Sequence, residues 1–260
     1  MRARVVSAAQ GARWMLAGWR LFRLAPFTWV GALFGCFALV MLLSRVPLLG
    51  PPLSVALTPA LWAGLMALAR TASGDRREAP AAFVRVLRRE ARPLAVLGVF
   101  YLAANVVAIA ATIPFGEGLL ADWVFRGKAP AGELLASPAF LLDVALSLLF
   151  YAPAMLANWY APVLVTWHAI GAPKALFFSI TACLINWRAF TAYGAAAAAA
   201  FAAVFALCSV ASGLLVAQAG ATPEGTMVVV LPVFAIFACA LIASAYASYA
   251  EVFGESAGGA

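Results

Sequence analysis

Charged residues are scarce in this sequence, and their scarcity excludes an ordinary soluble protein. Only 10% of the 260 residues are Asp, Glu, Lys or Arg, whereas 66% are hydrophobic, and the mean hydropathy is +0.99. Soluble domains have about a quarter charged and about half apolar residues. The composition therefore indicates an integral membrane protein.

Histidine and cysteine are also rare, which removes the side chains that most metal sites and catalytic triads need. His168 is the single histidine, so a histidine metal site or a Ser-His-Asp triad has no spaced partner. The four cysteines lie inside apolar segments without a C-x-x-C spacing, which is typical of small buried hydrophobic residues. The sequence therefore favours a non-enzymatic protein with no catalytic residue, no metal and no cofactor, and we interpret His168 as an interfacial residue.

Six apolar stretches are long enough to cross the roughly 30 Å hydrocarbon core of a bilayer as helices. They cover residues 26–43, 52–69, 94–114, 139 to about 158, 190–217 and 227–249. Fourteen of the 17 basic residues fall on one side of these spans if residues 171–187 stay on that side, and Arg45, Arg126 and Lys128 fall on the other. Because basic residues are enriched in cytoplasmic loops, we expect an inner-membrane protein with both termini in the cytoplasm.

Residues 171–187, GAPKALFFSITACLINW, have two interpretations. A seventh span would bury Lys174, at a cost of about 2.5–3.5 kcal/mol for a lysine at the centre of the bilayer. A surface helix, which we favour, would keep Lys174 and Arg188 in the cytoplasm. We then expect the apolar stripe, which includes Cys183, to face lipid and the small stripe to pack on the bundle. The small stripe consists of Ala175, Ser179, Ala182 and Asn186.

Three similar segments precede the first, third and fifth spans and suggest an internal repeat. They are ARWMLAGWRLFRLAPFTWVG from Ala12, APAAFVRVLRREARPLAVLG from Ala79 and APKALFFSITACLINWRAFTAYG from Ala172. A proline in the first two copies, and Asn186 in the third, follows 14 residues after that alanine. We therefore predict an all-α integral membrane protein, a six-transmembrane-helix bundle of three repeats of an in-plane amphipathic helix plus a transmembrane hairpin. The single membrane domain would comprise residues 1–70, 71–167 and 168–250, with a short tail at 251–260.

The basic residues of the surface segments are candidate ligands for lipid headgroups. Attraction to anionic lipid is worth about 1 kcal/mol per basic residue near the membrane surface, although solvated charge is the alternative interpretation. The first two copies of the repeat lack the small stripe of the third and contain arginines instead. The candidates are Arg13, Arg20, Arg23, Arg85, Arg88, Arg89, Arg92, Lys174 and Arg188. We expect anionic lipids as partners, no nucleic acid, and a homo-oligomer or a membrane-protein partner as further options.

A few polar residues fall within or beside the apolar segments. Asp143 is the only acidic residue inside a predicted span, which makes it a candidate for proton or cation coupling, or else a helix cap or headgroup contact. Asn105 and Asn158 would form a packing pair or line a cavity. Pro153 and Pro162 either break the fourth span at a binding site or lie in one tilted helix. The alternative function is therefore a small transporter or permease subunit. The polar candidates are Asp143, Asn105, Asn158, His168, Ser179 and Asn186.

The stretch YAPVLVTWHAIGAPKALFFSITACLINWRAF resembles an uncharacterised family of proteobacterial multi-pass inner-membrane proteins. The residues that carry the resemblance are Ala161, Pro162, Gly171, Ala175, Leu176, Ser179, Asn186 and Trp187. The N-terminal GARWMLAGWRLFRLAPFTWVG looks like the opening of the same family. The helix order is more loosely similar to the six-helix membrane domain attached to some glycerophosphodiester phosphodiesterases, but the barrel domain of those enzymes is absent from this sequence. The resemblance covers most of the chain and implies fold and location, without catalytic or binding residues.

Overall fold

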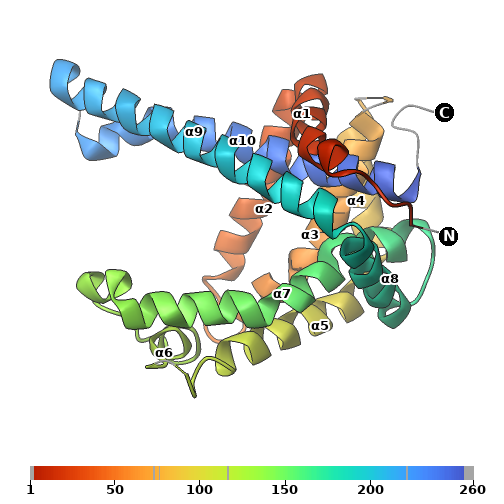
Figure 1. Ribbon diagram of the computed structural model, residues 1–260, viewed down its shortest axis with the longest axis horizontal. Coiled ribbons are helices and arrows are strands. Elements are labelled where there is room, and N and C mark those ends of the chain that lie inside the picture. The colour runs from red at the N-terminus through yellow and green to blue at the C-terminus, as the bar shows by residue number, and fades with distance from the viewer. Residues whose placement is uncertain (1–2, 73, 76, 116, 221, 255–260) are drawn as a thin grey trace. The chain divides into compact units, whose positions relative to one another are not determined.

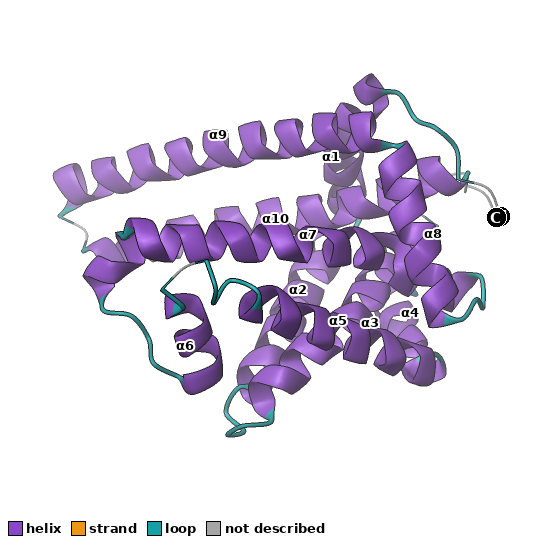
Figure 2. Cartoon of the chain, turned by 60° about the horizontal axis from the view of Figure 1, so that its bottom comes forward, coloured by secondary structure: helices purple, strands orange, loops and turns teal. Residues whose placement is uncertain are grey.

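The computed structural model describes residues 3–72, 74–75, 77–115, 117–220 and 222–254, which are helical with short connections (Figure 1). No β-strand occurs among the residues in these ranges (Figure 2). The elements are α1 (Ala8–Leu24), α2 (Pro26–Leu43), α3 (Gly50–Ala72), α4 (Ala79–Arg89), α5 (Ala91–Ala110), α6 (Leu119–Arg126), η1 (Gly132–Ala136), α7 (Pro138–Trp167), α8 (Ala172–Ile185), α9 (Trp187–Ala219) and α10 (Pro223–Phe253). Arg2 and Arg76, two of the fourteen basic residues, lie outside the described residues, as does most of the predicted tail.

Six of the helices, α2, α3, α5, α7, α9 and α10, are long and apolar enough to cross a membrane. The apolar α8 has 14 residues and would be about 21 Å long, shorter than the roughly 30 Å hydrocarbon core. The prediction of an all-α protein with six candidate spans is therefore confirmed. The fourth span is one helix of 30 residues that continues through Pro153 and Pro162, so of the two alternatives for these prolines the structure has the unbroken helix.

The described chain forms two compact units, which we treat separately. The first contains residues 1–45, 61–89 and 181–260, and the second contains residues 46–60 and 90–180. Both α3 and α8 contribute residues to each unit.

In the first unit, α1 packs across the antiparallel pair α9 and α10 (Figure 1). The helix begins at a capping box, in which Ser7 Oγ accepts from the Gln10 amide at 3.3 Å and Gln10 Oε1 accepts from the Ser7 amide at 3.1 Å. Gly11 faces the backbone of Ala189, and Gly18 faces the backbone of α10, so closely that a Cβ atom at either position would collide. The first copy has no continuous small stripe, as expected, but two glycines alternate with Trp14 and Phe22 on its buried face.

In the second unit, α5 packs on α7, and α6 and η1 lie against the first half of α7 (Figure 2). Gly98 of α5 approaches the carbonyl of Ala56 so closely that any side chain there would clash. Further along the pair, the rings of Tyr101 and Tyr151 meet edge to face with centroids 5.9 Å apart. Small residues and aromatic contacts thus bring α3, α5 and α7 together within this unit.

Three pairs of helices share the same kind of junction. A single non-helical residue joins α1 to α2, α4 to α5 and α8 to α9, and these residues are Ala25, Glu90 and Asn186. The break in the second copy comes before Ala91, so Pro93 is the third residue of α5 and does not mark the junction. The sequence alignment on Pro26, Pro93 and Asn186 therefore compares positions that differ between the copies.

Candidate functional site

The arginines of α1 project away from the helices that α1 covers. Its buried face consists of Gly11, Trp14, Gly18 and Phe22. Arg13, Arg20 and Arg23 are all exposed on the rest of the helix. Because the buried face fixes the rotation of α1, these three cations are held on its open side.

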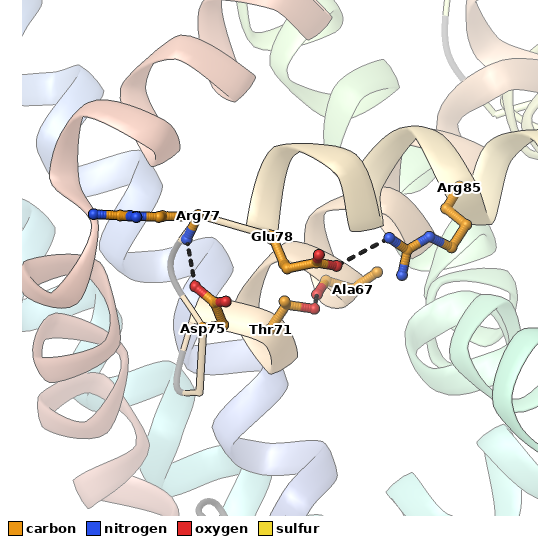
Figure 3. A network of polar contacts seen from close by, with 6 residues as sticks. All are labelled: Ala67, Thr71, Asp75, Arg77, Glu78 and Arg85. Carbon is orange, nitrogen blue, oxygen red and sulfur yellow. Dashed lines mark hydrogen bonds and ion pairs between the residues drawn. The ribbon is translucent and has the colours of Figure 1, made fainter.

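Arg77, in the connection between α3 and α4, and Arg85, in α4, are also exposed and belong to a network of polar contacts (Figure 3). Thr71 Oγ1 donates to the carbonyl of Ala67 at 2.9 Å, and Asp75 Oδ1 accepts from the Arg77 amide at 2.9 Å. Arg85 Nη2 lies 3.0 Å from Glu78 Oε2, and both side chains are about half exposed. An exposed pair of this kind contributes between about 0 and 1 kcal/mol, so its main effect is to orient Arg85.

Arg88 and Arg89 complete the basic surface of α4. Both are exposed, and neither makes an ion pair with the residues that the structure describes. Ala79 and Ala82 are buried on the other side of this helix. The helix is therefore amphipathic, with arginines on its open face.

The remaining basic candidates are exposed as well, and two of them lie over aromatic rings. Lys174 Nζ lies 5.8 Å from the Phe178 ring centroid, and the Arg188 guanidinium carbon lies 5.4 Å from that of Trp187. Such contacts favour a cation by roughly 0.5–1 kcal/mol at exposed sites. Arg92, in the first turn of α5, is exposed without a ring contact among those described.

Asn186, at the junction of α8 and α9, binds the extended segment that leads into α1. Its Oδ1 accepts from the Val6 amide at 2.7 Å, and its Nδ2 donates to the carbonyls of Arg4 at 3.0 Å and Ala182 at 2.9 Å. The side-chain amide thus pairs with the backbone of residues 4 and 6 as a neighbouring strand would. The Arg4 amide in turn donates to the Val252 carbonyl of α10 at 2.7 Å. Residues 4–6 are therefore held between α10 and the α8–α9 junction.

Ser179 bridges a backbone pair in α7. Its hydroxyl accepts from the Tyr160 amide at 2.9 Å and donates to the Leu156 carbonyl at 2.7 Å. An α-helix joins these two groups directly, so Ser179 binds at one rung of the helical ladder, close to Pro162. All four members of the small stripe are at most 1% exposed, as expected, but Cys183 is also buried and does not face lipid.

Asp143 is fully buried in the second turn of α7. Its Oδ2 accepts from the amide of Leu120 in the first turn of α6, at 3.3 Å. The carboxylate thus caps α6, whose N-cap residue Gly118 has no side chain to do so. The expectation of a cap at the start of its own helix is wrong, since Ser137 caps α7 by accepting from the Phe140 amide at 3.2 Å.

The other polar candidates bond mainly within their own helices. Asn105 Nδ2 donates to the Tyr101 carbonyl at 2.8 Å, and Asn158 Nδ2 donates to the Ala154 carbonyl at 3.0 Å. The described hydrogen bonds do not pair the two asparagines with each other. His168 ends α7, and its amide donates to the Leu164 carbonyl at 3.2 Å.

A probable inner membrane protein of Burkholderia thailandensis is 32% identical to this chain over 263 residues, which cover 98% of this chain and 95% of the relative. This chain belongs to the same family of inner-membrane proteins. With its six apolar helices it is a multi-pass membrane protein. No family model matches the chain, and no solved structure matches it significantly.

Two side-chain contacts of this inner-membrane protein are not among the residues that the sequence singles out. Trp14 is 1% exposed, and its indole Nε1 donates to Glu251 Oε2 at 2.9 Å. Tyr193 lies beside it, 5.7 Å between ring centroids, and its hydroxyl is 2.7 Å from Ser244 Oγ. The spacing of Gly11, Trp14 and Gly18 on one helical face was the available signal for this cluster.

Proposed function

We propose that this protein is a non-enzymatic membrane protein that binds anionic lipid headgroups through its basic surface helices, with both termini in the cytoplasm. The observation that carries the proposal is the fixed rotation of α1 and α4. Each helix buries one face and exposes its arginines on the other. Each basic residue near an anionic membrane surface contributes about 1 kcal/mol of attraction.

The three single-residue junctions support a repeat of a surface helix followed by a membrane helix. A break of one residue redirects the chain at once, so a helix in the membrane plane can lead directly into a span. The likeness to the membrane domain attached to some glycerophosphodiester phosphodiesterases concerns this helix order only. We include in the proposal a second copy of the chain or a membrane-protein partner that binds the same basic surface.

Retention of phosphatidylglycerol tests the headgroup proposal. The protein is reconstituted in nanodiscs of mixed phosphatidylglycerol and phosphatidylethanolamine, released into detergent, and its bound lipid is counted by native mass spectrometry. We expect the Arg13→Gln, Arg20→Gln, Arg23→Gln triple variant to lose most of the enrichment in phosphatidylglycerol. Lys128→Gln, an exposed cation on the opposite predicted side, is the matched control. Equal enrichment in both variants and the parent would contradict the proposal.

The transporter alternative has one observation in its favour. Asp143 Oδ1 and Asn158 Oδ1 are buried without a hydrogen-bond partner among the described residues. A bound cation at Asp143 would satisfy the first of them. A rise in melting temperature with sodium, lost in Asp143→Asn, would favour this function, whereas the cap on α6 alone predicts no sodium dependence.

A further inference from the structure

An apolar groove runs along α2 in the first unit. It has a volume of about 400 Å³ and is bounded by α2, α3 and α4. The residues of α2 that line it are Thr28, Gly31, Ala32, Gly35, Cys36 and Leu39. Their spacing places all six on one face of the helix.

The glycines of this face meet nothing in their own chain. A Cβ atom built on Gly31 or Gly35 has no atom of another helix within 4 Å, whereas one on Gly64 would lie 2.7 Å from the Phe83 ring. Phe83 belongs to α4 and lines the same groove. The small residues of α2 therefore leave space open, and they do not serve close helix packing within the described chain.

The dimensions of the groove fit one acyl chain better than a second helix. From Thr28 to Leu39 the helical rise is about 16 Å, close to the roughly 15 Å of one leaflet. A single turn of helix, about 10 Å wide and 5.4 Å high, already occupies roughly 400 Å³. The groove would therefore hold one turn of a partner helix or the full depth of one lipid tail.

A cation stands at the edge of this groove. Val84 and Leu87 of α4 line it, and Arg88 follows them on the same side of the helix, exposed. Arg89 lies a further 100° around α4, and Arg85 is paired with Glu78. Arg88 is thus the arginine that a headgroup would meet above a tail in the groove, which favours an anionic phospholipid as the occupant.

We propose that the groove binds one acyl chain of an anionic phospholipid of the cytoplasmic leaflet, with its phosphate beside Arg88. This inference rests on the proposed function and adds a defined tail site to it. The apolar lining excludes water from the tail, and Arg88 selects the charge of the headgroup. Charge-assisted bonds from a guanidinium to phosphate are among the stronger hydrogen bonds in proteins.

Photolabelling locates the tail directly. Phosphatidylglycerol with a diazirine midway along one chain is incorporated in nanodiscs with the full chain, irradiated, and the labelled peptides are identified by mass spectrometry. We expect label on peptides of α2 and α4. The Gly31→Leu, Gly35→Leu variant should lower the labelling of these peptides about tenfold. The added side chains would compete with the tail for the same space, and overpacking of this kind costs about the free energy of a tenfold change in affinity or more. Val84→Trp fills the groove from α4 and provides a second test should the double variant misfold.

Matched variants separate the tail, the headgroup and general effects. Gly194→Leu is the control for substitution, because Gly194 also meets nothing within 4 Å and lies near the start of a candidate span, α9. Arg88→Gln should reduce the preference for phosphatidylglycerol over phosphatidylethanolamine about fivefold, the factor that corresponds to the loss of one basic residue at the surface. Arg89→Gln should leave that preference unchanged.

Several results would overturn the inference. Undiminished labelling in both groove variants would show that the tail binds elsewhere. Equal labelling by the two lipids would remove the headgroup contact with Arg88. A loss of dimers in the Gly31→Leu, Gly35→Leu variant without a loss of label would assign the groove to a second copy. Loss of phosphatidylglycerol retention in the α1 arginine variant, with unchanged labelling in the groove variants, would leave the proposed function standing and reject the groove. Groove labelling that falls in both groove variants and in Arg88→Gln as expected, with equal phosphatidylglycerol retention in the parent and the α1 arginine variant, would reject the proposed function instead.

Discussion

The helices α1 and α4 are both short, basic and followed by a candidate span, yet they pack differently within the first unit. Two glycines and a buried tryptophan of α1 allow this helix to contact the backbones of α9 and α10 closely. Beside α4, the two glycines of α2 face open space of about 400 Å³. The two helices are therefore similarly basic but differ in packing, because α1 is closely packed and α4 borders a groove that a ligand can enter.

This difference shows that the meaning of a small residue in a membrane helix depends on what it faces. A glycine against a backbone permits close packing, and any larger side chain there is excluded. A glycine beside an empty groove has no such constraint and can be replaced without a clash. The following changes break or sharpen the contrast between the two helices, from the largest expected effect to the smallest.

Gly18→Leu on α1 should be the most destructive change. The added side chain would collide with backbone atoms of Ala240 and Ser244, and we expect a loss of at least about 3 kcal/mol of unfolding free energy, the upper end for overpacking. Gly35→Leu on α2 should leave stability unchanged or raise it by up to about 1 kcal/mol, because leucine favours a helix over glycine. SDS titration in mixed micelles measures both. Equal destabilisation by the two variants would contradict the contrast.

Asn186→Ala should release the segment that leads into α1. The Val6 amide and the Arg4 carbonyl would lose their partner, at a cost of about 2–3 kcal/mol for buried groups left unpaired. Hydrogen exchange at residues 4–7 should rise together with this loss. Asn105→Ala is the control, because the backbone group that Asn105 bonds, the Tyr101 carbonyl, belongs to its own helix, and we expect a cost of less than about 1 kcal/mol. A cost no greater than that of the control would show that the segment is held by other contacts.

Trp14→Phe should have a moderate effect. The ring contact with Phe190, 5.4 Å between centroids, is retained, while the hydrogen bond to Glu251 is lost. Glu251 is exposed, so water can replace the indole, and we expect about 1 kcal/mol. Glu251→Gln keeps an acceptor and should be close to neutral in the same unfolding assay. If Glu251→Gln costs as much as Trp14→Phe, charge rather than the hydrogen bond holds this contact.

Ser179→Ala should have the smallest effect. The Tyr160 amide and the Leu156 carbonyl that it releases are natural helical partners and can bond each other, so we expect less than about 1 kcal/mol. Ser179→Val has a larger side chain at a fully buried position and should cost about 1–3 kcal/mol. The order of these two variants in thermal unfolding decides whether space or hydrogen bonding dominates at this site. An alanine variant less stable than the valine variant would contradict the prediction.

The apolar spans and the small stripe of α8 could be predicted from the sequence, because both depend on composition and helical spacing within one segment. Ser179 and Asn186 were recognised as polar members of a stripe that packs. Their partners were not predictable, since Val6 lies 180 residues from Asn186 and no local pattern joins them. A cap on its own helix was one of the alternatives for Asp143, but the amide that it binds belongs to Leu120 of α6, 23 residues earlier in the chain.

The glycines of α1 and α2 show a further limit. The close contacts of Gly11 and Gly18 could not be predicted, because a glycine in a sequence does not indicate which neighbour it approaches. Gly31 and Gly35 of α2 are also two glycines on one helical face, but they lie beside open space and not against another backbone. Only the packing of the neighbouring helices distinguishes a closed contact from a groove.

The most direct measurement is a cryo-EM map of the protein in nanodiscs that contain phosphatidylglycerol. We predict tail density along Gly31 and Gly35, headgroup density beside Arg88, and direct contact of Gly18 with Ala240 and Ser244, without lipid between α1 and α10. A map in which α4 has closed onto α2, or in which a second copy fills the groove, would contradict the account.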